Sequence, residues 1–108
     1  MTREERREYR NAINVIDYQL LSKPFIANEL TRTQLEAIIL AVRSMEERMK
    51  ETEMPLRKQI AMLSYHIKNP TALLFRDKNT MDALQEGIMA MKWMMKDDTC
   101  EMLWRGVL

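Results

Sequence analysis

The stretch of sequence that decides the fold runs from residue 35 to residue 51 and reads LEAIILAVRSMEERMKE. Its large apolar side chains recur at steps of three and four residues, which places them on one face of an α-helix. These side chains belong to Leu35, Ile38, Val42, Met45 and Met49. Such a face is typical of antiparallel helix packing. Thr31 and Thr33 are each followed three residues later by Gln or Glu, so a capping box at either threonine would begin this helix.

The apolar pattern continues beyond Pro55. Leu56 and Leu63 extend the seven-residue spacing of the preceding helix, and the next helix is expected to end near Asn69, because Pro70 follows it. Two interpretations of Pro55 stay open, a kinked continuous helix and a tight break. No Gly or Asn marks a turn there, and no strong N-capping residue precedes the proline.

Further helices are predicted on both sides of this region. The first begins at a capping box of Thr2 and Glu5, runs to about residue 21 and ends before Pro24. Its core face consists of Tyr9, Ala12, Ile13, Ile16 and Leu20. The last long helix is expected to begin at Asn79 or Thr80. Short helical segments are predicted at residues 25–30, 71–75 and 99–105.

The composition favours a single all-α domain over residues 1–108. Only two glycines and three prolines interrupt a chain rich in helix-forming residues, and 108 residues are enough to bury one core. We therefore predict a compact helical bundle of three long helices plus one or two short helices. The net charge of +1 provides no overall field that would draw the chain to nucleic acid or to an anionic membrane.

The N-terminal sequence and the cysteine content predict a cytoplasmic protein. The start, MTREERREYR, lacks the apolar segment of a signal peptide, and the single cysteine, Cys100, cannot form an intramolecular disulfide. The longest aliphatic run, residues 37–42, is much shorter than the roughly 20 residues that a membrane-spanning helix needs. We therefore expect no membrane insertion.

The last long helix contains more apolar side chains than one core face needs. Its core face is predicted to consist of Met81, Leu84, Ile88, Met91 and Met95. A second apolar face begins with Met89 and Trp93, which lie one turn apart, and Cys100 and Trp104 extend it if the helix continues.

Three interpretations of this second face stay open. The helix is surrounded within its own domain, or it presents a surface to a subunit or target, or it lies at a membrane interface. The acidic side chains of Glu86, Asp97 and Asp98 oppose the membrane interpretation.

Four arginines are predicted to share one flank of the first helix, opposite three glutamates. The arginines are Arg3, Arg6, Arg7 and Arg10, and the glutamates are Glu4, Glu5 and Glu8. Like charges four residues apart destabilise a helix slightly. The pattern indicates either a solvated helix end, or a charged flank that docks against neighbours of opposite charge or against phosphates.

The sequence contains no recognisable catalytic or metal-binding pattern. His66 is the only histidine and Cys100 the only cysteine, so they cannot complete a zinc site. As a nucleophile and base they would lack an orienting third group and a Gly-rich oxyanion loop. We therefore expect a protein without enzymatic activity, metal or cofactor.

Residues 26–38, IANELTRTQLEAI, resemble a helix-turn-helix motif. Ala27 and Leu30 stand where that family has small and apolar residues in its first helix, and Thr33 stands where its recognition helix is capped. Thr31 replaces the usual turn glycine, and Arg32 replaces the apolar residue that follows it. The resemblance implies a small DNA-binding regulator.

The preferred hypothesis is instead a protein-protein interaction module, an adaptor or inhibitor that docks on a larger protein and self-associates. Small helical proteins of this kind are often accessory proteins of viruses or mobile elements. The side chains expected to contact the partner are those of Met89, Trp93, Met94, Trp104, Arg3, Arg6, Arg7 and Arg10. Nucleic acid is the alternative partner.

Overall fold

The computed structural model describes residues 1–21, 29–69 and 78–95. Its helices are α1 (Arg3–Asn14), a π-helix η1 (Val15–Leu21), α2 (Arg32–Thr52), α3 (Arg57–Lys68) and α4 (Lys78–Met94). The predicted all-α bundle is confirmed. The short segments predicted at 71–75 and 99–105, and most of the one at 25–30, lie outside the described residues, as do Cys100 and Trp104.

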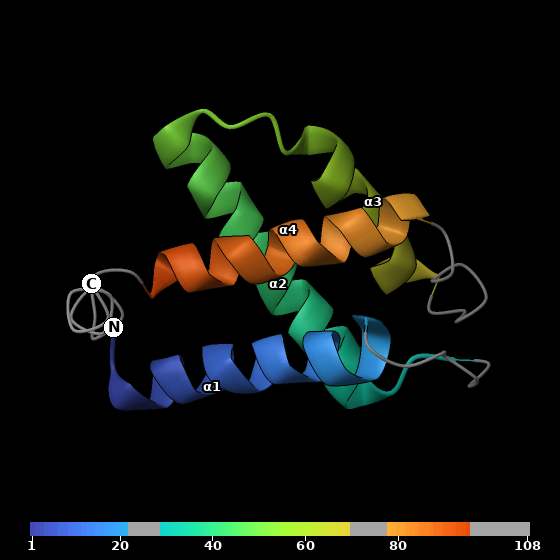
Figure 1. Cartoon of the computed structure of the whole chain (residues 1–108), viewed down its shortest axis with the longest axis horizontal. Coiled ribbons are helices and arrows are strands. Elements are labelled where there is room, and N and C mark those ends of the chain that lie inside the picture. The colour runs from blue at the N-terminus through green and yellow to red at the C-terminus, as the bar shows by residue number, and fades with distance from the viewer. Residues whose placement is uncertain (22–28, 70–77, 96–108) are drawn as a thin grey trace.

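Helices α2 and α4 form the centre of the bundle, because they pack against each other and each also contacts α1, η1 and α3. Helices α1 and α4 run in opposite directions on the same side of the molecule (Figure 1). The N-terminal end of α1 and the C-terminal end of α4 therefore lie at the same end of the bundle. The turn between α2 and α3 lies on the side of the molecule away from α1.

The first helix begins at the predicted capping box. The backbone N–H of Glu5 donates to Thr2 Oγ1 at 3.1 Å, and the backbone N–H of Thr2 donates to Glu5 Oε1 at 3.3 Å. After Asn14 the helix widens into η1 and ends at Leu21, where the sequence predicted its end. Its core-facing residues are buried or partly buried, and they are Tyr9, Ala12, Ile13, Ile16 and Leu20.

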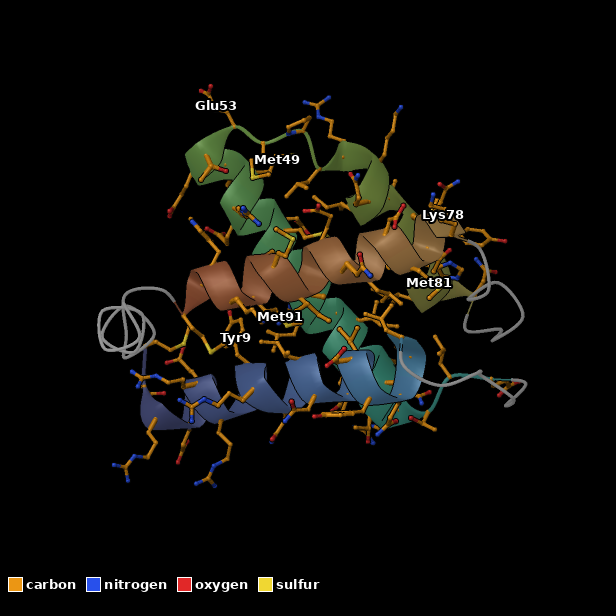
Figure 2. All side chains as sticks on the ribbon, in the orientation of Figure 1. Tyr9, Met49, Glu53, Lys78, Met81 and Met91 are labelled. Atoms are coloured by element: carbon orange, nitrogen blue, oxygen red, sulfur yellow. The ribbon has the colours of Figure 1, made fainter. Side chains whose placement is uncertain are left out.

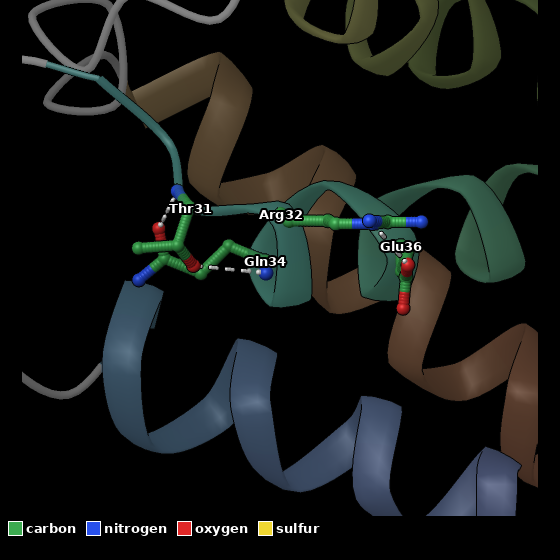
Figure 3. Close-up of polar contacts among 4 residues, drawn as sticks. All are labelled: Thr31, Arg32, Gln34 and Glu36. Carbon is green, nitrogen blue, oxygen red and sulfur yellow. Dashed lines mark hydrogen bonds and ion pairs between the residues drawn. The ribbon is translucent and has the colours of Figure 1, made fainter.

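Helix α2 is capped by Thr31 and not by Thr33. Gln34 donates its backbone N–H to Thr31 Oγ1 at 3.2 Å and accepts the Thr31 N–H on Oε1 at 2.9 Å (Figure 3). The side-chain amide of the same Gln34 donates to Gln19 Oε1 at 3.0 Å, which ties the cap to η1. Thr33 therefore lies within the first turn of the helix and is exposed.

Pro55 marks a break between two helices, not a kink. Helix α2 ends when Glu53 adopts the left-handed conformation, with φ 56° and ψ 24°. The Leu56 N–H donates to the Met54 carbonyl at 2.9 Å, which closes a tight turn around Pro55 before α3 begins. Proline has no N–H to donate and disfavours helical geometry at the residue before it, which favours a break at this position. Leu63 is nevertheless fully buried, and the core continues across the break.

Helices α2 and α4 approach each other closely where they cross. A Cβ atom built on Gly87 would lie 2.8 Å from the Cβ of Ala41, closer than real Cβ contacts, so only glycine fits at this crossing. The neighbouring small side chains on both helices are also buried, and they are Ala37, Ala83 and Ala90. The predicted core face of α4 consists of buried and partly buried residues, as the core face of α1 does. Leu84, Met91 and Met95 are buried, but Met81 and Ile88 are only partly buried, because the small residues take the closest contact.

A buried polar pair joins α3 to α4. His66 is 2 % exposed, and its Nε2 lies 3.1 Å from the hydroxyl oxygen of Thr80, which is also 2 % exposed. The prediction that Asn79 or Thr80 caps the last helix is wrong, because α4 already includes Lys78. Thr80 instead lies within the helix, and its hydroxyl is within hydrogen-bond distance of His66 Nε2.

Candidate protein-docking surface

The C-terminal half of α4 divides its apolar side chains between the core and the surface. Met91 is fully buried and Met95 is 5 % exposed, whereas Met89 is 49 % exposed. Trp93, one helical turn after Met89, is partly buried, and so is Met94. Trp104, the fourth apolar residue predicted to contact a partner, lies outside the described residues.

Helix α4 is not surrounded by the rest of the domain. A stripe of exposed residues follows its length at helical spacing, and it consists of Lys78, Asp82, Gln85, Met89 and Lys92. Met89 is the only apolar member of that stripe, and the large apolar ring of Trp93 lies beside it. The surplus methionines noted in the sequence are therefore not all required by the core.

The arginine flank of α1 lies largely in solvent. Arg3, Arg7 and Arg10 are exposed and Arg6 is partly buried. Among the described residues, Arg3, Arg7 and Arg10 form no ion pair or hydrogen bond through their side chains. These three cations are therefore available to an acidic partner.

On the opposite flank, Glu5 already has a structural role. Its carboxylate accepts the Thr2 N–H, and that hydrogen bond, with a further one to the Thr2 side chain, lowers the pKa of Glu5 below its ordinary value of 4.5. This flank also faces α2, because Glu8 and Val15 line a groove of about 550 Å³ between α1 and α2. The arginines occupy the edge of α1 away from that groove.

The fold brings the two predicted sets of partner residues to one end of the molecule. Arg3 to Arg10 occupy the first turns of α1, and Met89 to Met94 occupy the last turns of α4, where the two helices lie side by side (Figure 1). Figure 2 shows Tyr9 and Met91 between these two helices. We call the surface formed by Met89, Trp93, Met94 and the arginines Arg3, Arg6, Arg7 and Arg10 the α1–α4 surface.

The helix-turn-helix resemblance finds little geometric support in the residues that the structure describes. Thr33 does not cap α2, and the helix expected to enter a DNA groove packs within the bundle against α1, η1, α3 and α4. The guanidinium Nε of Arg32 donates to Glu36 Oε1 at 3.1 Å, so the first basic group of that helix is already paired (Figure 3). Ala27 lies outside the described residues. DNA binding stays a prediction.

Sequence reasoning missed two surface hollows. One is the groove between α1 and α2, where Ile39 and Leu40 line one wall. The other lies at the turn between α2 and α3, where Met49 and Met54 are surrounded by basic residues. Ile39 directly follows Ile38 of the predicted apolar face, which is a weak signal for the first hollow. The second depends on how the chain turns at Pro55, which the sequence left open.

Within residues 1–21, 29–69 and 78–95, no group of three or more His, Cys, Asp or Glu side chains is placed to hold a metal ion. No helix in the same part of the chain is long and apolar enough to cross a membrane. Comparisons of this chain with known protein families, curated proteins and solved structures find no match.

Proposed function

We propose that this protein is a non-enzymatic interaction module that docks on a larger protein through the α1–α4 surface. The observation that carries the proposal is the exposed Met89 with the partly buried Trp93 one helical turn later, near the end of the helix where Met94 is also partly buried. A methionine side chain adapts to irregular partner surfaces, and a tryptophan supplies a large contact area with little loss of conformational entropy. Such groups are typical of the residues that dominate binding energy at protein interfaces.

The neighbouring arginines favour a partner with acidic side chains around an apolar patch. Arg3, Arg7 and Arg10 are exposed cations at the same end of the bundle as Met89. Opposite charges on the partner would raise the association rate and fix the orientation of docking, while the apolar contacts supply most of the affinity. An adaptor or an inhibitor that alters the assembly or activity of a larger protein is consistent with such a surface.

We propose self-association through the same apolar residues as a second use of this surface. In a symmetric dimer each Met89 would meet the same surface of the other copy. The arginines of two copies would then lie near one another and repel, which weakens the dimer at low salt. We therefore favour a different, acidic protein over a second copy of this chain as the partner.

The experiment is an affinity capture from host lysate with the tagged full chain and two charge-matched variants. Met89→Glu places a charge in the apolar patch, and Tyr65→Glu makes the same kind of change at a side chain that is 53 % exposed on α3. A protein partner retained by the parent chain and by Tyr65→Glu, but lost by Met89→Glu, supports the proposal. If Met89→Glu and Tyr65→Glu retain the partner equally well, the proposal is contradicted.

Nuclease treatment and salt separate the DNA-binding alternative. A protein partner survives nuclease and high salt, because its contacts are mostly apolar. Nucleic acid recovered only at low salt, and lost on Arg32→Glu, would instead favour the helix-turn-helix interpretation.

A further inference from the structure

A second surface, separate from the α1–α4 surface, lies at the turn between α2 and α3. It is a hollow of about 700 Å³, and Met49 and Glu53 mark its position on the side of the molecule away from α1 (Figure 2). We infer that this hollow is a docking site for an acidic segment of a partner protein. An apolar side chain of that segment would enter the hollow, and carboxylates on either side of it in the segment would contact the surrounding cations. The elbow site, as we name it, consists of Met49, Lys50, Glu53, Met54, Pro55, Arg57 and Lys58.

The floor of the elbow site is apolar, and backbone hydrogen bonds close the turn that forms it. Met49 and Met54 are partly buried and pack against the bundle core. The turn between them is fixed by two backbone hydrogen bonds of 2.9 Å, from the Glu53 N–H to the Met49 carbonyl and from the Leu56 N–H to the Met54 carbonyl. Pro55 restricts the backbone further. A preformed apolar floor lowers the entropy lost when a partner binds.

The rim of the elbow site is basic. Lys50, Arg57 and Lys58 are exposed, and with the single carboxylate of Glu53 they give the lining a net charge of +2, although the whole chain has only +1. Among the described residues none of these three cations forms an ion pair or a side-chain hydrogen bond. Helix α3, RKQIAMLSYHIK, contains no acidic residue that could pair with them within the helix.

The start of α3 also lacks the acidic residues that usually stabilise a helix N-terminus. Its N-cap is Leu56, which provides no side-chain hydrogen bond, and its first two residues are Arg57 and Lys58. Two cations at the positive end of a helix are unfavourably placed. Carboxylates of a bound partner would neutralise the cations of the rim and would also interact favourably with the positive end of α3. The site is therefore complementary to a negatively charged partner.

An acidic peptide fits this site better than nucleic acid does. Phosphates would satisfy the cations, but bases bind proteins by stacking on aromatic rings, and no aromatic side chain lines the hollow. The methionine floor instead suits an aliphatic or aromatic side chain of a peptide. Both features, the apolar floor and the basic rim, are used only when the occupant combines an apolar side chain with carboxylates.

The test begins with a random peptide library displayed on phage and selected against the immobilised full chain. We expect the enriched peptides to be acidic and to contain a large apolar residue. The enriched peptides, labelled with a fluorophore, are then measured by anisotropy against two variants, Lys58→Glu and Lys68→Glu. Both variants make the same change of charge on exposed residues of α3, but only Lys58 lines the elbow site.

Lys58→Glu is expected to weaken peptide binding about tenfold, and Lys68→Glu to leave it within about twofold. Lys58→Glu puts a carboxylate in the first turn of α3, which stabilises the helix, so lost binding cannot be attributed to unfolding. Met54→Ala removes part of the apolar floor and is expected to weaken binding of the same peptides. Circular dichroism checks that this variant is folded.

Three results would overturn the inference. The first is enrichment of peptides with no excess of acidic residues. The second is peptide binding that Lys58→Glu leaves unchanged. The third is an oligonucleotide probe that binds in a Lys58-dependent way while the acidic peptides do not.

Discussion

At the scale of single residues, the crossing of α2 and α4 depends on one missing methyl group. Gly87 is buried in the core. A Cβ atom added to it would lie closest to the Cβ of Ala41, which is attached directly to a helix backbone and cannot rotate away. Glycine is a poor helix former, so its presence in the middle of a 17-residue helix has a cost that the close packing must offset.

Gly87→Ala is therefore expected to destabilise the protein, although alanine is the better helix former. Helix propensity alone would raise the free energy of unfolding by about 1 kcal/mol. Overpacking against Ala41 is expected to outweigh that gain and to lower the free energy of unfolding by a net of about 1–3 kcal/mol in urea titrations. The double variant Gly87→Ala/Ala41→Gly exchanges the two residues and should restore most of the stability. If the double variant is less stable than Gly87→Ala alone, the crossing is not limited by this contact.

The buried pair of His66 and Thr80 makes a second prediction at this scale. Thr80→Val keeps the shape of the side chain but removes the hydroxyl that lies 3.1 Å from His66 Nε2. Leaving a buried polar atom without that partner costs about 1–3 kcal/mol of unfolding free energy. Thr52→Val is the matched control, because the Thr52 hydroxyl also forms a hydrogen bond, to the Arg48 carbonyl, but at an exposed position. Equal effects of the two substitutions would mean that burial of the pair contributes nothing.

At the scale of helices, the two capping boxes fix where α1 and α2 begin. Thr31→Ala is expected to lower the free energy of unfolding by about 1 kcal/mol, because the Gln34 N–H loses its acceptor. Thr33→Ala is expected to raise it by a few tenths, at most about 0.5 kcal/mol, because Thr33 is exposed within the helix and alanine is the better helix former. Chemical unfolding of the two variants checks both signs. If Thr33→Ala lowers the free energy of unfolding more than Thr31→Ala does, Thr31 is not the residue that caps α2.

The cap of α1 is expected to weaken in acid. Hydrogen bonds from Thr2 lower the pKa of Glu5 in the folded protein below 4.5. A carboxyl whose folded pKa is lowered stabilises the fold above its unfolded pKa, and this contribution disappears as the pH falls through the folded pKa. NMR titration of the Glu5 carboxyl should give a lower midpoint in the folded chain than in the chain unfolded by urea. Equal midpoints would show that the capping box does not form in solution.

The sequence predicts helices better than it predicts how they touch. The three-four spacing of large apolar residues identified the core faces of α1 and α2, since periodicity reports which side of a helix is apolar. On α4 it identified Leu84, Met91 and Met95 but missed the small residues Ala83, Gly87 and Ala90, because alanine and glycine contribute little to an apolar pattern although they permit the closest approach. The sequence pattern does not distinguish Thr31 from Thr33, because each is followed three residues later by Gln or Glu, and the left-handed turn at Glu53 has no glycine to announce it.

The candidate surfaces follow the same division. The surplus of apolar residues in α4 was readable from the sequence, and the structure places Met89 in solvent. The elbow site was not readable, because its residues come from the end of one helix, a turn and the start of another. Only the break at Pro55 brings the methionines and the cations around one hollow.

At the scale of the whole molecule, the bundle has two separate candidate surfaces, each combining apolar side chains with exposed cations. The α1–α4 surface combines Met89, Trp93 and Met94 with exposed arginines, and the elbow site lies on the side away from α1. A module with two separate docking surfaces can join two partners, or two segments of one partner. The central claim is that the first of these surfaces contacts another protein.

Site-specific photocrosslinking tests that claim most directly. A benzophenone amino acid is placed at position 89 or, as a control, at position 65, which is exposed to a similar degree on α3. The full chain is irradiated in nuclease-treated host lysate, and the adducts are separated by mass. The proposed function predicts one dominant protein adduct from position 89 and none of that mass from position 65. The same adducts from both positions, or no protein adduct from position 89, would contradict it.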